Sequence, residues 1–222
     1  MPKALSTQLR IFCDFDGTIA QRDVGNLVFG HFGSESHWWG LVELWQQGRL
    51  EGREMWRRQA EVMRLTETEL HEFLAPLAID TSFGMLAGFA RQEGIPVTIV
   101  SDGMDAYIAP ILAAHGFGDL PLRTNRMVLT PEGAVRVEFP WSGQGCGQCA
   151  NCKGLHVRRE RLPGETTVYI GDGPSDICGA READIVFAKK QLLAWCRENS
   201  HPHYPFTSFA DIHDHLQGLL KR

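Results

Sequence analysis

Four short stretches of the chain are apolar at successive positions and rich in β-branched residues. They are Leu9–Cys13, Pro96–Val100, Thr167–Ile170 and Asp184–Ala188, and Gly, Asp or Pro residues bound them. Apolar side chains at consecutive positions are typical of strands that are buried on both faces, as in a parallel sheet. The pattern therefore predicts four central strands of such a sheet.

Between these strands the apolar positions change to a helical spacing. They recur three or four residues apart in Leu70–Leu77, Met104–Leu112 and Phe209–Leu219. Such a stripe covers one face of an amphipathic helix, and Thr66 with Glu69 has the spacing of a capping box before the first stripe. Alternating strands and helices predict an α/β fold with a doubly wound, Rossmann-like parallel sheet as its core.

Two stretches interrupt this alternation. Residues 14–95 separate the first two strands, far more than one crossover helix needs, and residues 24–85 have a helical, Trp-rich pattern. We therefore expect an inserted helical cap at residues 24–85, with residues 1–23 and 86–222 forming the α/β catalytic core. The second interruption is Arg126–Phe139, where two short runs flank the turn sequence of Pro131 to Gly133 and predict a hairpin.

The charge balance narrows the range of partners. The 222 residues include 22 basic and 27 acidic side chains, a net charge of −5, with no basic block. This composition disfavours nucleic acid and anionic membranes as partners. The first residues have no apolar signal core, and no apolar run approaches the roughly 18 residues of a membrane span. We expect a cytoplasmic protein and leave its oligomeric state open.

The first candidate site follows the first predicted strand. Asp14 and Asp16 come at its end, followed by Gly17 and Thr18. Ligands bind at the carboxyl ends of strands in open α/β sheets, and Mg²⁺ prefers oxygen ligands of this kind. Gly17 allows close approach of the backbone to a phosphate. The alternative is a surface turn, in which Asp-Gly is common.

Later segments repeat the arrangement. Ser101, Asp102 and Gly103 follow the second strand and could cradle a phosphate, or simply cap the next helix. Asp172 and Asp176 follow the third strand, where an Asp-Gly-Pro turn is the alternative. Between them Lys153 offers a point charge for phosphate, although a lone lysine is usually a solvated surface residue.

The order of these motifs resembles the four-motif pattern of the haloacid dehalogenase superfamily, and the resemblance covers essentially the whole chain. The helical insertion after the first motif is similar to that of the phosphoserine-phosphatase-like branch. Asp23 stands where that branch has an acidic residue facing the substrate. Asp102 departs from that branch, which has Gly there. The arginine that grips the carboxylate of phosphoserine has no clear counterpart; its candidates are Arg53, Arg57 and Arg58.

Other segments resemble the methionine-salvage 2-hydroxy-3-keto-5-methylthiopentenyl-1-phosphate phosphatases. These are the run from Ser101 to Asp105, the Cys-rich stretch ending at Lys153, the run from Asp184 to Lys189, and the tail from Tyr204 to Ile212. The resemblance implies a small phosphorylated metabolite, and this ketose phosphate in particular, as the substrate. Phosphoserine and phospho-aminoalcohols are the alternative substrates.

The superfamily resemblance also implies a mechanism. Asp14 attacks phosphorus to form an aspartyl-phosphate, and Asp16 gives a proton to the leaving group and later takes one from water. The expected Mg²⁺ ligands are Asp14, the Asp16 carbonyl oxygen and Asp172, with Asp176 close by. We expect the phosphate and the rest of the substrate to be held by the following residues: Thr18, Asp23, Ser101, Asp102, Gly103 and Lys153.

The cysteines raise a separate question. Cys146, Cys149 and Cys152 stand three residues apart, which is a spacing that zinc sites use. A fourth ligand is not obvious, and His156 is the nearest candidate in sequence. Free thiols in a Gly-rich loop are the favoured interpretation, and a Zn²⁺ site is the alternative.

Two functions other than a phosphatase are compatible with parts of this pattern. A phosphotransferase would pass the aspartyl-phosphate to an alcohol instead of water. A non-catalytic metal-binding module would use the Cys loop alone. The module is disfavoured because it has no chemical need for the carboxylates, Ser101 and Lys153 together.

Overall fold

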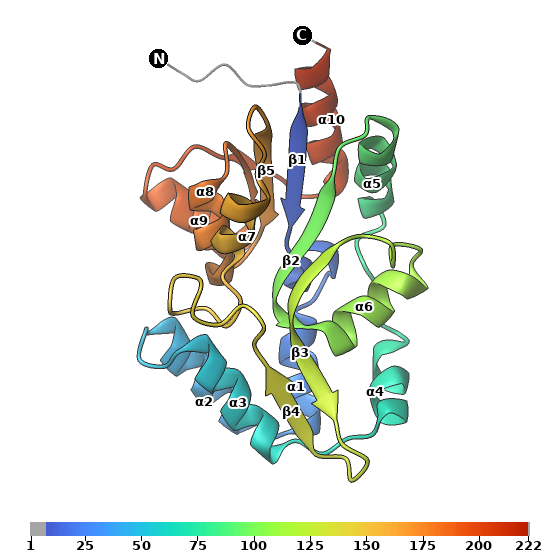
Figure 1. Ribbon diagram of the computed structural model, residues 1–222, viewed down its shortest axis with the longest axis vertical. Coiled ribbons are helices and arrows are strands. Elements are labelled where there is room, and N and C mark those ends of the chain that lie inside the picture. The colour runs from blue at the N-terminus through green and yellow to red at the C-terminus, as the bar shows by residue number, and fades with distance from the viewer. Residues whose placement is uncertain (1–7, 222) are drawn as a thin grey trace.

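A computed structural model describes residues 8–221, and it contains a seven-stranded, mostly parallel sheet (Figure 1). The strand order is β4-β3-β2-β1-β5-β6-β7, and only β3 and β4 pair antiparallel. The strands are β1 (Leu9–Cys13), β2 (Val97–Met104), β3 (Leu122–Leu129), β4 (Val135–Glu138), β5 (Thr166–Gly171), β6 (Ile185–Ala188) and β7 (Tyr204–Pro205). The α/β, Rossmann-like core is therefore confirmed.

Residues 8–221 form ten α-helices, which lie on the two faces of this sheet or beyond its carboxyl edge. They are α1 (Val24–Phe32), α2 (Glu35–Gln46), α3 (Gly52–Val62), α4 (Glu67–Leu74), α5 (Phe83–Gln92), α6 (Asp105–Ala114), α7 (Lys153–Glu160), α8 (Ile177–Glu182), α9 (Lys190–Glu198) and α10 (Phe209–Leu220). Two short helical turns, η1 (Phe15–Ile19) and η2 (Pro174–Asp176), follow β1 and β5. Helices α5, α6 and α10 lie on one side of the sheet and α7, α8 and α9 on the other (Figure 1).

The alternation of side chains along β1 explains these two layers. Ile11 and Cys13 belong to the larger apolar cluster, which includes α5, α6 and α10, whereas Phe12 belongs to the cluster with Val157 and Leu192 of α7 and α9. Successive side chains of a strand point to opposite faces, so a central strand must be apolar at every position. This is the physical origin of the continuous apolar runs in the sequence.

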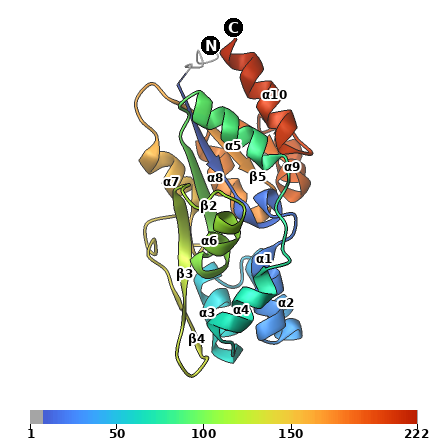
Figure 2. The same ribbon diagram turned by 90° about the vertical axis from the view of Figure 1, so that its right-hand side faces the viewer.

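The predicted insertion contains helices α1 to α4, which lie beyond the carboxyl edge of the sheet together with the β3–β4 hairpin (Figure 2). The hairpin has the predicted turn, with Gly133 at φ 79°. The capping box of Thr66 and Glu69 is also present at the start of α4. The expected boundary between residues 85 and 86 falls inside α5, and the division into core and cap stays a prediction.

The second strand is longer than predicted. The expected strand ended at Val100, but β2 continues to Met104 with a register shift between Val100 and Met104 against β3. Ser101 to Gly103 are therefore extended backbone, and none of their side chains caps α6, whose N-cap residue is Met104. Among residues 8–221, no helix combines the length and apolarity needed to cross a membrane.

Candidate active site

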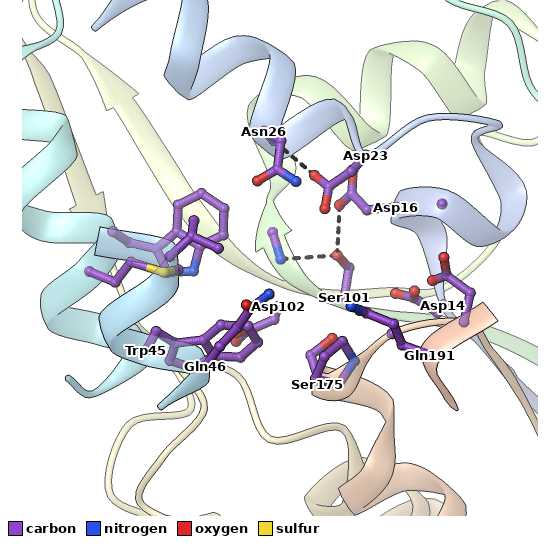
Figure 3. A pocket seen from close by; sticks show the side chains of 18 of the residues that line it. Asp14, Asp16, Asp23, Asn26, Trp45, Gln46, Ser101, Asp102, Ser175 and Gln191 are labelled. Carbon is purple, nitrogen blue, oxygen red and sulfur yellow. Dashed lines mark hydrogen bonds between the residues drawn. The ribbon is translucent and has the colours of Figure 1, made fainter. Parts of the chain in front are cut away.

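The loops that follow β1, β2 and β5 meet at one edge of the sheet, because the carboxyl ends of adjacent parallel strands lie side by side. They border a cavity of about 200 Å³ whose opposite wall comes from α1, α2 and α3 (Figure 3). The core side of the cavity is lined by Asp14, Asp16, Gly17, Ser101, Asp102, Gly103, Lys153, Asp172, Gly173, Pro174, Ser175, Lys190 and Gln191.

Lys153 is not a solvated surface residue. It begins α7, is 1% exposed, and its Nζ lies 2.6 Å from Asp14 Oδ1 and 2.6 Å from Asp176 Oδ1. Burial lowers the pKa of this ammonium, but the Asp14 and Asp176 carboxylates outweigh that effect and raise the pKa overall. A permanently charged ammonium is thus held directly beside the carboxylate of Asp14.

Three buried carboxylates form a group that suits a divalent cation. Asp14, Asp172 and Asp176 each offer an oxygen within 4.8 Å of the other two. The Oδ2 atom of Asp176 already accepts hydrogen bonds from the backbone N–H groups of Asp172 and Gly173, both at 2.8 Å. Asp14 and Asp172 are therefore better placed to bind a metal ion, while Asp176 orients Lys153 and the loop.

The charge balance at this group also favours a cation. Lys190, which sequence reasoning did not single out, places its Nζ 2.8 Å from Asp172 Oδ2 and 2.9 Å from the Gly17 carbonyl oxygen. The three carboxylates and the two lysines leave one net negative charge. Mg²⁺ fits this all-oxygen donor set and would make the net charge of the group positive. A positive group is needed to bind a phosphate dianion.

Asp16 lies outside this group of three carboxylates. Its Oδ1 accepts the Val24 and Gly25 backbone N–H groups at 2.8 Å and 3.2 Å, and so caps the start of α1. Its Oδ2 accepts hydrogen bonds from the Ser101 hydroxyl at 3.3 Å (Figure 3) and the Tyr107 hydroxyl at 3.4 Å. Desolvation, with a contribution from Asp23, raises the pKa of Asp16 to about 8. Its carboxyl group thus has the character of an acid at neutral pH.

Ser101 and Gly103 lie directly beside Asp16. The Gly103 N–H donates to Ser101 Oγ at 2.9 Å. A Cβ atom at position 103 would overlap the Tyr107 hydroxyl and approach Asp16 Oδ2, so only glycine fits here. Tyr107 is fully buried on α6 and was not predicted as a site residue, because an aromatic residue in a helical stripe looks like ordinary core.

The carboxylate of Asp102 does not repel substrate as an unpaired charge would. Its Oδ1 accepts the backbone N–H of Asn151, and Asn125 Nδ2 donates to the Asp102 carbonyl oxygen at 2.7 Å. Burial raises the pKa of this carboxyl to about 7. The departure from glycine at this position is thus compensated by a polar partner from the loop that precedes Lys153.

Asn151 is a third residue, after Lys190 and Tyr107, that the sequence analysis did not identify. Its Nδ2 donates to the carbonyl oxygens of Ser101 and Arg123 at 2.8 Å and 2.9 Å, and its Oδ1 lies 2.7 Å from His156 Nε2. Burial lowers the pKa of His156 to about 4, so the neutral ring donates this bond. His156 therefore supports Asn151, and its Nε2 is not available to the cysteines as the fourth ligand considered from sequence.

The opposite wall of the cavity is mainly aromatic. Its residues are Asp23, Asn26, Trp38, Trp39, Val42, Trp45, Gln46, Met55 and Trp56. Asp23 accepts the Asn26 N–H at 2.8 Å and so caps α1. Trp38 Nε1 donates to Asn26 Oδ1 at 2.9 Å, whereas the buried indole N–H groups of Trp45 and Trp56 have no hydrogen-bond partner among residues 8–221. This wall can therefore offer apolar surface to a ligand.

The cap arginines considered as carboxylate grips do not reach the cavity. Arg53 pairs with Glu51 and Ser142, and Arg57 and Arg58 both pair with Glu54. In the described part of the chain, no arginine lines the cavity, and its two lysines both lie at the carboxylate end. The far end of the cavity is thus uncharged apart from Asp23.

The fold and this edge of paired carboxylates and lysines define the chain as a phosphatase. A family model of haloacid dehalogenase-like hydrolases matches residues 11–181, and the chain belongs to that family. The resemblance deduced from the four motifs is confirmed.

The similar proteins carry more than one name. A "2-hydroxy-3-keto-5-methylthiopentenyl-1-phosphate phosphatase" of Geobacillus thermodenitrificans is 33% identical over 97% of this chain and 98% of its own length. "Pdp3-interacting factor 1" of Schizosaccharomyces pombe is 30% identical over 98% of both chains. A solved structure of phosphoserine phosphatase with a phospho-aspartyl intermediate analogue shares the fold, with a TM-score of 0.72 and 19% identity over 96% of this chain and 99% of that one.

Proposed function

We propose that this protein is a Mg²⁺-dependent phosphomonoesterase that uses Asp14 as its nucleophile and 2-hydroxy-3-keto-5-methylthiopentenyl-1-phosphate, or a close analogue, as its substrate. The observation that carries the proposal is the division of the cavity into two ends. One end has Asp14, Asp172 and Lys153, and the other has tryptophan side chains and no cationic residue among residues 8–221. The first end suits a phosphate, and the second an uncharged, apolar group.

The steps of the reaction follow from the positions of the side chains. Asp14 lines the cavity and attacks the phosphorus atom, which forms an aspartyl-phosphate and releases the alcohol. Lys153 holds the negative charge of the transferring group, and the Thr18 hydroxyl, which donates to Asp14 Oδ2 at 3.4 Å, helps to position the nucleophile. Mg²⁺, held by Asp14, Asp172 and the Asp16 carbonyl oxygen, would neutralise phosphoryl oxygens.

Asp16 is proposed as the proton donor. Its raised pKa keeps a proton available for the leaving oxygen, and the hydroxyls of Ser101 and Tyr107 fix the position of its Oδ2. After the alcohol has left, the ionised Asp16 takes a proton from the water that attacks the aspartyl-phosphate. Asp16 thus returns to its starting state at the end of each turnover.

The substrate named for the relatives fits the far end of the cavity chemically. Beyond its phosphate it carries a hydroxyl, a ketone and a methylthio group, none of which is charged. Trp38, Trp45 and Trp56 provide apolar surface for the methylthio end.

Phosphoserine is a weaker candidate for the same site. Its ammonium and carboxylate groups would have to lie against the tryptophan wall. The cap arginines do not reach this wall, because they form ion pairs with Glu51 and Glu54. Burying an unpaired carboxylate there would cost several kcal/mol. Nothing specific in the cavity favours a phosphotransferase over a phosphatase.

The decisive assay compares kcat/KM for the ketose phosphate, phosphoserine and phosphoethanolamine, each with Mg²⁺ and again after removal of metal by a chelator. We expect the ketose phosphate to be preferred by at least about 100-fold, which corresponds to roughly 2.7 kcal/mol of differential binding. We also expect activity to return only when Mg²⁺ is added back. Preference for phosphoserine would overturn the substrate, and full activity without divalent metal would overturn the mechanism.

A further inference from the structure

A group of four cysteines lies beside α7, outside the cavity described above. Cys146, Cys149 and Cys152 belong to the loop before α7, and Cys178 lies in the first turn of α8. The sulfur atoms of Cys146, Cys149 and Cys178 lie within 4.8 Å of one another. The thiol of Cys178 also contacts that of Cys152. The fold therefore brings Cys178, from a distant part of the sequence, next to the three cysteines of the loop.

The spacing of these sulfur atoms is close to that of a metal site. Zinc binds thiolate sulfur at about 2.3 Å, so four sulfurs around one ion stand about 3.8 Å apart. The separations of at most 4.8 Å among the sulfurs of Cys146, Cys149 and Cys178 are compatible with that spacing. None of these cysteines forms a disulfide, and the other two cysteines, Cys13 in β1 and Cys196 in α9, are buried elsewhere.

The backbone around the cluster is arranged to receive thiolates. The N–H of Cys149 points at Cys146 Sγ, with N and S 3.4 Å apart, and the N–H of Gln148 also faces this sulfur. The N–H of Leu155 faces the sulfur of Cys152 in the same way. Gly147, at φ 83°, allows the tight turn between Cys146 and Cys149. Several amide dipoles thus converge on sulfur atoms, which stabilises negative charge there.

We propose that Cys146, Cys149, Cys152 and Cys178 bind one structural Zn²⁺ ion as four thiolate ligands. Soft thiolates select Zn²⁺ over Mg²⁺, and four protein ligands leave no open position for catalysis. The site is distinct from the oxygen-lined carboxylate group.

A Zn²⁺ ion at this cluster would connect two segments of the active site. Cys152 directly precedes Lys153, and Cys178 follows Asp176 by two residues, so the ion would join the two segments that carry the 2.6 Å Lys153–Asp176 ion pair. The backbones of α7 and α8 are already in close contact, because a Cβ at Gly154 would overlap the carbonyl oxygen of Cys178. The ion would therefore fix the position of Lys153 without touching the substrate.

The same loop also contacts the helical insertion. Gln148, between two of the cysteines, accepts the Gly52 N–H at 2.8 Å and donates through Nε2 to the Leu50 carbonyl oxygen at 2.9 Å. A Zn²⁺ ion at the cluster would thus fix the position of the cysteine loop. Through Gln148, this loop contacts the segment that leads into α3. Loss of the ion should loosen both the Lys153 segment and this contact.

Metal content tests the proposal without any activity measurement. The protein is purified without chelators from zinc-supplemented cells, and zinc per chain is measured by mass spectrometry for the wild type, Cys178→Ser and Cys196→Ala. We expect about one zinc in the wild type and in Cys196→Ala, and less than roughly one tenth of that in Cys178→Ser. A wild type without zinc, or equal zinc in all three proteins, would overturn the site.

A second measurement covers the case in which Cys178→Ser does not fold. The wild-type protein is treated with a mercurial reagent in the presence of a colorimetric zinc indicator, and separately its zinc is exchanged for Co²⁺. We expect zinc release in step with thiol modification, and the intense visible bands of Co²⁺ in tetrahedral sulfur coordination. Absence of both signals from folded wild-type protein would contradict the proposal.

Discussion

The two walls of the cavity differ in how far their polar groups are satisfied within the protein. On the core side, Lys153 at the start of α7 forms ion pairs with both Asp14 and Asp176, which follow β1 and β5. On the opposite side, the buried indole N–H groups of Trp45 and Trp56 have no partner among the described residues. The reactive side chains of the first wall are thus held in position by one another, whereas the second wall contains two polar groups that the described residues leave unsatisfied.

This difference suggests that the two walls do different work. Preorganised charges serve a reaction step, because they need not move when negative charge develops on phosphorus. Apolar surface serves recognition, because an uncharged, apolar part of a substrate binds there rather than in water. Substitutions on the core wall should therefore change turnover, and substitutions on the tryptophan wall should change substrate preference.

Replacement of the nucleophile should have the largest effect. In Asp14→Asn the carboxylate that attacks phosphorus is lost, and we expect kcat to fall on the order of 10⁴-fold or more. The side chain remains nearly isosteric, so the circular dichroism spectrum should match that of the wild type. Turnover within tenfold of the wild type, measured with any phosphorylated substrate, would rule out Asp14 as the nucleophile.

Replacement of Asp16 should have a smaller effect that depends on the leaving group. Asp16→Asn keeps an oxygen to cap α1 but cannot donate a carboxyl proton, so we expect alkyl phosphates to react about 10²–10⁴-fold more slowly. Release of p-nitrophenolate needs no proton, so p-nitrophenyl phosphate should still give a fast burst before slow dephosphorylation. Stopped-flow absorbance measures this burst, and an equal loss with both kinds of ester would argue against a proton-donor role.

Two tryptophans of the opposite wall form a matched pair. Trp56→Phe and Trp38→Phe remove the same atoms, but only Trp38 has a hydrogen-bond partner, Asn26. We expect Trp38→Phe to lower Tm more, since it leaves the Asn26 oxygen unpaired at a cost of about 1–3 kcal/mol. Trp56→Phe leaves no polar partner unpaired, so we expect a smaller fall in Tm and about a 5-fold fall in kcat/KM from lost apolar contact with the substrate, the equivalent of about 1 kcal/mol. An equal fall in Tm for the two variants would contradict the stabilising role of the Trp38–Asn26 hydrogen bond.

The smallest expected effect concerns Asp102 and the pH dependence of stability. Its folded-state pKa of about 7 lies above the unfolded value, so its ionisation opposes folding above about pH 4 and reaches its full cost above pH 7. Asp102→Asn should therefore raise Tm at pH 8, by about 2–4 °C for each kcal/mol added to the free energy of unfolding. This increase in Tm should vanish near pH 4. Calorimetry of both proteins across this range checks the prediction, and a gain that is independent of pH would exclude titration as its cause.

Much of the core wall could be deduced from the sequence because strand position fixes it. Asp14, Ser101 and Asp172 each follow an apolar run, and parallel strands bring their carboxyl ends to one edge. Lys190 also follows a predicted strand, the run ending at Ala188, so its place at the same edge of the sheet could have been predicted from the sequence. Tyr107 and Asn151 gave no comparable signal, because their roles depend on packing between elements distant in sequence.

The opposite wall could be predicted only as a region. The sequence predicted residues 24–85 as a helical, Trp-rich cap, and four of its tryptophans line the cavity. Which indole N–H groups lack partners depends on side-chain orientation, which periodicity does not encode. Cys178 was missed for a related reason: it lies in a different segment from the three spaced cysteines, and only the packing of α7 against α8 brings it to them.

The central claim is that Asp14 carries the phosphoryl group during turnover. Its most direct test is acid quenching of Asp16→Asn within milliseconds of mixing with p-nitrophenyl phosphate and Mg²⁺, followed by peptide mapping by mass spectrometry. The account predicts one phosphoryl group per chain, attached to Asp14 and absent when metal is removed. Phosphorylation of another residue, or release of p-nitrophenolate without any phosphorylated protein, would contradict it.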